Sequence, residues 1–251
     1  EMTHDQMIHD QKIQDPSAPA SQAAMPLSNA SGFVYTADEL ANSISVIDLA
    51  SSRVDTFPLG LSPHNVQVTA DGSQLLAVGM AAMDAGVPSP GVDMAHGEMD
   101  DEGQLLVFDT GNLTAGPVAT IEVGDHPAHV VVDEKARTAF VTLSEENAVA
   151  VVDLGTNAIV RIIGTGTYPH GLRISPDGST LYVANVEDDS VSVIDLAGFS
   201  EIARIPVGDA PVQVGFTPDG SRVYVSLRYE DRVAAIDTST REVISKIDVG
   251  P

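Results

Sequence analysis

Histidine stands at recurring positions beside proline in this chain, where its ring nitrogens could bind a transition-metal ion. The four related segments are LSPHNVQV, DHPAHVVV, TYPHGLRI and DAPVQVGF, and the first three carry histidine. Imidazole nitrogen is a ligand for zinc and copper among other ions. If these segments meet in the fold, they predict one metal site made of His64, His129 and His170, with His126 as a further candidate. His129 follows its proline by two positions rather than one, which in a regular strand would turn it to the opposite face.

A second signal is a hexamer, Met-x-His-x-x-Met, that occurs twice. Thioether and imidazole together suit Cu(I) and, with more imidazole, Cu(II), whereas zinc rarely takes methionine. The hexamers resemble the Met/His motifs of periplasmic copper- and silver-handling proteins. They predict two copper-binding arms, one formed by Met2, His4, Met7 and the following His9, and the other by Met94, His96 and Met99.

The composition excludes several kinds of partner. Lys and Arg number 12 against 36 Asp and Glu, a net charge of −24, which disfavours nucleic acid and anionic membrane surfaces. No run of eighteen apolar residues is present, so we expect no membrane insertion. The chain has no Cys, and a Cys-free chain rich in Met and His suits an oxidising compartment, so we expect a periplasmic or extracellular protein.

Catalytic motifs are missing from the sequence. It contains no GxSxG, HExxH, Walker or dinucleotide-binding pattern, and no CxxCH for covalent haem. We therefore assign no catalytic residues and favour a protein that is not an enzyme. A metal-dependent oxidase or lyase that uses the same histidines stays open.

The strands that must position the histidines can be inferred from a sequence repeat. The prolines at positions 127, 169 and 211 are 42 residues apart. Pro63 precedes Pro127 by 64 residues, because the first unit carries an insertion. Each unit has four short apolar strands, and three of the units place an Asp-Gly turn after the first strand. This predicts an all-β fold, a β-propeller of four-stranded antiparallel blades, with four complete repeats and a partial blade at 33–60.

The repeats resemble the YVTN family of β-propellers, in SPDGSTLYVANVEDDSVSVIDL and FVYTADELANSISVIDL among others. Propellers of that family usually have seven blades. The resemblance therefore implies seven blades if the chain is part of a longer protein, and otherwise a ring of about five. We divide the chain into a flexible tail, 1–32, and a propeller, 33–251, with an inserted loop at 80–103.

These features predict an exported propeller that binds copper at a central histidine site and transfers or buffers it with the help of the Met/His arms. Its partners would be the metal ion and a protein that donates or accepts it. Three alternatives stay open: a periplasmic zinc metallochaperone, a copper-dependent metalloenzyme and a non-catalytic interaction scaffold.

Overall fold

A computed structural model describes residues 30–81, 102–133, 135 and 137–250 of the chain. In this part, strands form five antiparallel sheets, each built from strands consecutive in sequence. The first sheet has three strands and the other four have four each, as the repeat predicts. No helix in the same part is long and apolar enough to cross a bilayer. The fold is all-β, with propeller-like blades.

The five sheets are called blades 1 to 5 in chain order. Blade 1 contains β1 (Phe33–Asp38), β2 (Ser43–Asp48) and β3 (Val54–Pro58), and blade 2 contains β4 (Leu61–Val68), β5 (Gln74–Ala81), β6 (Glu102–Asp109) and β7 (Ala119–Asp125). Blade 3 contains β8 (Pro127–Asp133), β9 (Thr138–Leu143), β10 (Ala148–Asp153) and β11 (Ala158–Gly164). Blade 4 contains β12 (Pro169–Ile174), β13 (Thr180–Asn185), β14 (Ser190–Asp195) and β15 (Ser200–Pro206). Blade 5 contains β16 (Pro211–Phe216), β17 (Arg222–Leu227), β18 (Arg232–Asp237) and β19 (Glu242–Asp248). Two short 3-10 helices, η2 (Glu39–Ala41) and η3 (Thr110–Ala115), connect strands in blades 1 and 2.

The turn between the first two strands of a blade is encoded locally. In blade 4, Gly178 has a φ of 75°, a conformation that favours glycine. The Asp177 carboxylate accepts hydrogen bonds from the Ser175 hydroxyl at 2.6 Å and from the Ser179 backbone N–H at 3.0 Å. These bonds stabilise the charged carboxylate and lower the pKa of Asp177. The Asp-Gly pairs are therefore structural residues of the hairpins.

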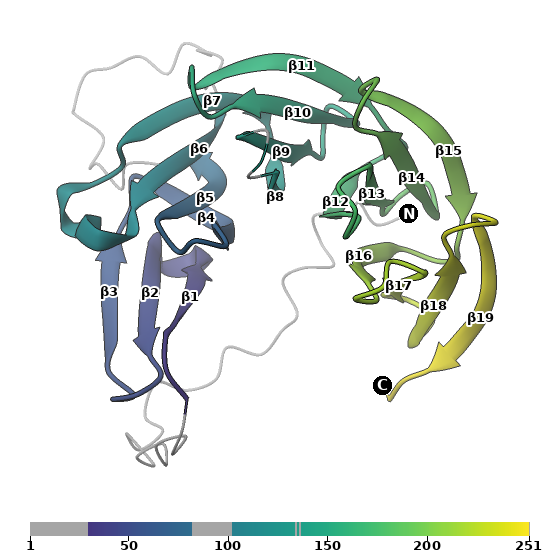
Figure 1. Cartoon of the computed structure of the whole chain (residues 1–251), viewed down its shortest axis with the longest axis horizontal. Coiled ribbons are helices and arrows are strands. Elements are labelled where there is room, and N and C mark those ends of the chain that lie inside the picture. Colours follow the sequence, from purple (N-terminus) through teal and green to yellow (C-terminus); the bar gives the residue numbers. More distant parts are fainter. Residues whose placement is uncertain (1–29, 82–101, 134, 136, 251) are drawn as a thin grey trace, which may run out of the picture.

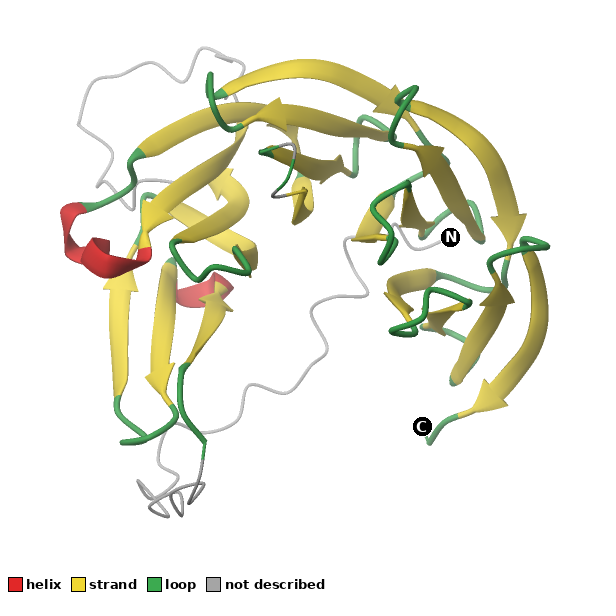
Figure 2. Ribbon diagram, in the orientation of Figure 1, coloured by secondary structure: helices red, strands yellow, loops and turns green. Residues whose placement is uncertain are grey.

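The blades follow one another along an open arc (Figures 1 and 2). The strands β4, β8, β12 and β16 lie on its concave side, and β7, β11, β15 and β19 lie on its outer side (Figure 1). The hydrophobic core lies between blades, since each buried cluster combines residues of two neighbouring sheets, such as Leu105 of blade 2 with Val141 of blade 3. In the described part of the chain, blades 1 and 5 do not close a ring.

The predicted boundaries of the inserted loop need correction. β5 continues to Ala81 and β6 begins at Glu102, so the strands reach into the range 80–103 that the sequence assigned to the loop. The ladder pairs Met80 with Gly103, which extends the sheet beyond the apolar run that marked the strand. Residues 1–29 and 82–101 lie outside the described residues.

Candidate metal centre

The four strands on the concave side share an irregularity near their first residues. The ladder from each to the next strand shifts register just after a proline, namely Pro63, Pro127, Pro169 or Pro211. A bulge sets two residues opposite one on the partner strand, so neighbouring side chains there do not alternate strictly between faces. For this reason the histidine two positions after its proline can share a face with those that follow by one.

Three histidines from three adjacent blades meet on the concave side. His64 of β4, His129 of β8 and His170 of β12 each offer a ring nitrogen, and these nitrogens lie within 4.8 Å of one another. The ring centroids are 4.6 Å apart for His129 and His170, 5.2 Å for His64 and His170, and 5.6 Å for His64 and His129. His129 is buried, His170 is partly buried and His64 is exposed, so solvent reaches the group from the side of His64. We call these three residues the histidine triad.

The hydrogen bonds of two triad rings fix where their lone pairs point. His64 Nδ1 lies 3.1 Å from the carboxylate oxygen Oε1 of Glu39, and His170 Nδ1 lies 3.3 Å from the Val212 carbonyl oxygen. Both oxygens accept, so each Nδ1 carries the hydrogen, and a neutral ring then bears its lone pair on Nε2. These two Nε2 atoms face each other at 3.2 Å. Such a pair is stabilised by a cation between the nitrogens, either a proton or a metal ion.

The separation of these nitrogens matches that of ligands that share one ion. Two nitrogens about 2.0–2.1 Å from a tetrahedral zinc ion are roughly 3.3–3.4 Å apart. The distance of 3.2 Å between His64 and His170 is close to this value. His129 is the third candidate ligand, because its ring nitrogen lies within 4.8 Å of the other two.

Burial keeps two of the rings neutral. Desolvation, with smaller contributions from the neighbouring imidazoles of His170 and His64, lowers the pKa of His129 to about 3. Desolvation and, to a smaller extent, His64 together lower the pKa of His170 to about 4. A metal ion binds the neutral imidazole, so both rings have the protonation state that a ligand needs near pH 7.

Thr142 and Gln213 complete the surroundings of His129. The His129 backbone N–H donates to the Thr142 hydroxyl at 3.0 Å, and that hydroxyl lies 2.8 Å from the His170 carbonyl oxygen, to which it donates. In blade 5, the Gln213 N–H donates to the Ser226 hydroxyl in the same way, at 3.1 Å. Gln213 Nε2 lies 3.4 Å from His129 Nδ1, and Gln213 Oε1 is buried without a hydrogen-bond partner among the described residues.

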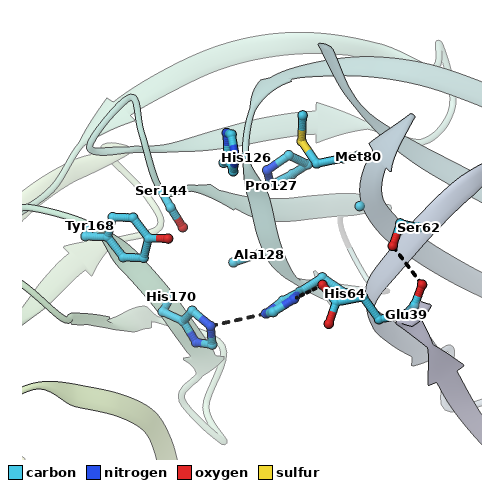
Figure 3. A pocket seen from close by; sticks show the side chains of 11 residues that line it. Glu39, Ser62, His64, Met80, His126, Pro127, Ala128, Ser144, Tyr168 and His170 are labelled. Atoms are coloured by element: carbon cyan, nitrogen blue, oxygen red, sulfur yellow. Dashed lines mark hydrogen bonds and ion pairs between the residues drawn. The ribbon is translucent and has the colours of Figure 1, made fainter. Parts of the chain in front are cut away.

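A cavity of about 220 Å³ adjoins the triad (Figure 3). His64 and His170 line it, and so do His126, Met80 and Tyr168. An ion held by the triad would have one side toward this space. Three protein ligands and an open position are typical of exchangeable and catalytic metal sites, whereas structural sites are closed.

The structure thus brings together His64, His129 and His170, as the repeat predicts. His126 lines the adjoining cavity but does not belong to the group of three. The residues predicted for the arms lie outside the described residues, namely Met2, His4, Met7, His9, Met94, His96 and Met99.

Sequence reasoning missed three residues of the centre: Glu39, Thr142 and Gln213. A signal for Gln213 was available, because it stands two positions after its proline, where DHPAHVVV has His129. Glu39 lies in η2, the connection between β1 and β2 of blade 1. Thr142 carried no signal, because its role depends on the bulge in the neighbouring strand.

We compared the chain with known protein families and solved structures. The sequence profile of a family described as Choice-of-anchor I domain matches residues 34–171, more than half of the chain. No curated protein matches the sequence. Among solved structures, hydrazine synthase of Kuenenia stuttgartiensis is similar, with 22% identity and a TM-score of 0.59 over 73% of this chain. The match covers 48% of that structure, so this chain spans about half of its length. At this identity the likeness concerns the fold alone.

Proposed function

Because the chain belongs to the Choice-of-anchor I domain family and gathers three histidines on the concave side of its blades, we propose that it is an exported β-propeller that binds copper and transfers or buffers it. The observation that carries this proposal is the pair of Nε2 atoms of His64 and His170, which face each other at 3.2 Å while both Nδ1 atoms have acceptors. His129 supplies the third ligand. The periplasm or the cell exterior is the proposed location.

Copper is preferred to zinc because of two sequence motifs outside the triad. Three imidazoles bind either ion, and the centre alone does not discriminate between them. The two Met-x-His-x-x-Met hexamers favour copper, since thioether sulfur is a ligand for Cu(I). We propose that these hexamers act as arms that collect the ion, and that a separate protein donates it to the propeller or accepts it.

Metal titration tests the proposal. Purified protein freed of metal is titrated with Cu(I), Cu(II) and Zn(II), each against a competing chelator, and compared with the double variant His64→Gln, His170→Gln. We expect the wild type to bind one ion at the centre and the variant to lose that site. Gln67→Ala is the control, because Gln67 is also on β4 but bonds only the Val68 carbonyl. Equal binding by wild type and double variant would refute the histidine centre.

A metalloenzyme is the second candidate, and the cavity beside the triad is the observation that favours it. A bound ion with one side toward a space of about 220 Å³ could bind a small substrate there. Turnover of an oxidisable substrate by the copper-loaded protein, lost in the double variant, would support an enzyme. Binding without turnover would leave the transfer or buffering role.

A further inference from the structure

Two further side chains of types that can bind a metal ion, Met80 and His126, line the cavity beside the triad. Met80 is close to the end of β5, and His126 immediately precedes β8. Both line the cavity that His64 and His170 also line (Figure 3). The four side chains therefore border one space of about 220 Å³.

The surrounding strands bring these two residues into one place. Met80 pairs with Gly103 of β6, and a Cβ on Gly103 would overlap the ring of Pro127. The missing side chain therefore lets the ends of β5 and β6 pack against the chain at His126. Met80 is only partly buried and is not a member of the buried hydrophobic core.

His126 is oriented as a metal ligand would be. Its Nδ1 lies 2.7 Å from the carboxylate oxygen Oδ1 of Asp125. The carboxylate accepts the Nδ1 hydrogen, which leaves the lone pair on Nε2, and a carboxylate behind a histidine is a common arrangement at metal sites. The side chains of both residues are about half exposed, so the ring is accessible from solvent.

The charge of the cavity favours a cation. Glu39 lines it, Asp125 supports His126, and none of the described residues in its wall is Lys or Arg. A wall with carboxylate oxygens and no fixed positive charge attracts a cation. Among cations, a thioether and an imidazole together select a soft one.

We infer that Met80 and His126 form a transient binding position for Cu(I), through which the ion enters and reaches the histidine triad. This inference rests on the proposed copper function and adds a source of selectivity to it. The triad accepts copper or zinc, whereas the entry position has a sulfur ligand that zinc rarely takes. Discrimination between the two ions thus occurs in the rate of entry rather than in the final affinity.

The test compares loading rates for two ions in two variants. Met80→Leu removes the thioether at nearly constant volume. His126→Asn removes the imidazole and keeps a residue that tolerates the positive φ of 45° at this position. Met25→Leu, a methionine outside both hexamers and outside the described residues, is the control. Loading with Cu(I) or Zn(II) is followed by stopped-flow with a chromogenic chelator, and circular dichroism checks the fold.

We expect each variant to load Cu(I) at least about tenfold more slowly than the wild type and the control, the scale of a lost supporting contact at a metal site. Met80→Leu should load Zn(II) at the wild-type rate, and its equilibrium affinity for Cu(I) at the triad should be unchanged. If a folded Met80→Leu protein loads Cu(I) at the wild-type rate, the entry position does not exist, while the triad still stands. If the wild type binds neither ion, the proposed function itself is wrong.

Discussion

Replacing Gln213 by leucine should weaken metal binding at the triad without disturbing the blades. Gln213 Nε2 lies 3.4 Å from His129 Nδ1, while its buried Oε1 has no partner among the described residues. The two ends of a side-chain amide have the same shape, so the assignment of nitrogen and oxygen follows from the hydrogen bonds they make. The prediction assumes that the amide is turned by half a rotation relative to the structure, so that Oε1 accepts the Nδ1 hydrogen of His129. His129 then keeps its lone pair on Nε2, as His64 and His170 do.

The expected loss of metal affinity follows from the hydrogen-bond acceptor that His129 loses when Gln213 is replaced by leucine. His129 is only 8% exposed, so an Nδ1 hydrogen that loses its acceptor is not rescued by water. An unsatisfied buried donor costs about 1–3 kcal/mol, and loss of an outer-shell partner of a metal ligand weakens binding about 10–100-fold. We therefore expect the dissociation constant of the Gln213→Leu protein to rise by about 10–100-fold. Gln213→Glu, whose carboxylate only accepts, should keep the affinity near that of the wild type.

Two measurements check this prediction. Competition titration with a chelator gives the affinity, and nitrogen-15 NMR of the imidazoles reports which nitrogen of His129 carries the hydrogen. Gln67→Leu on β4 is the matched control, since the Gln67 amide donates to the Val68 carbonyl. The reasoning fails if Gln213→Leu binds metal as tightly as the wild type and His129 keeps its hydrogen on Nδ1.

Three further outcomes are expected. Thr142→Val should destabilise the fold by about 1–3 kcal/mol and weaken metal binding, because it leaves the His129 N–H without its acceptor. Urea unfolding measures the first effect and metal titration the second. The free energy of unfolding of the metal-free protein should fall as the pH drops from about 6.5 toward 3, which urea unfolding at several pH values measures. In the folded state the pKa of His170 is about 4 and that of His129 about 3, so the unfolded state binds more protons over this range. Deleting residues 1–32 should lower the Cu(I) stoichiometry without changing the fold, which metal analysis and circular dichroism would detect; an unchanged stoichiometry would argue against the first arm.

The strands were predictable because their pattern is local. The apolar strand pattern recurs every 42 residues from Pro127 onward, Asp-Gly pairs mark the first turn in three of the four complete units, and each of these units forms a sheet of four strands. The three described strands of blade 1 were also predictable, since 33–60 holds three apolar segments. The boundaries of the insertion were not, because Met80 and Gly103 pair beyond the apolar residues that identify the strands.

The geometry of the centre was less accessible from sequence. The recurrence of histidine near proline identified His64, His129 and His170, but strict alternation placed His129 on the wrong face. The bulge after each proline resolves this, and a bulge leaves no mark on composition or period. Gln213 was passed over because an amide is not a common metal ligand. Gln213 matters because its Nε2 lies 3.4 Å from His129 Nδ1, and this distance depends on how blades 3 and 5 are placed relative to each other.

The polar residues of the centre come from all five blades. Blade 1 supplies Glu39 and blades 2, 3 and 4 supply His64, His129 and His170, while blade 5 supplies Gln213; only the relative placement of the blades brings them together. Each blade is held internally by its own ladder, but neighbouring blades are held by side-chain packing. An ion bound by three blades therefore links units that no backbone ladder connects. Because it binds only the assembled form, it should stabilise the arrangement by about 2.7 kcal/mol at a free concentration one hundred times its dissociation constant. Metal binding and the packing between blades are thus coupled through the same three side chains.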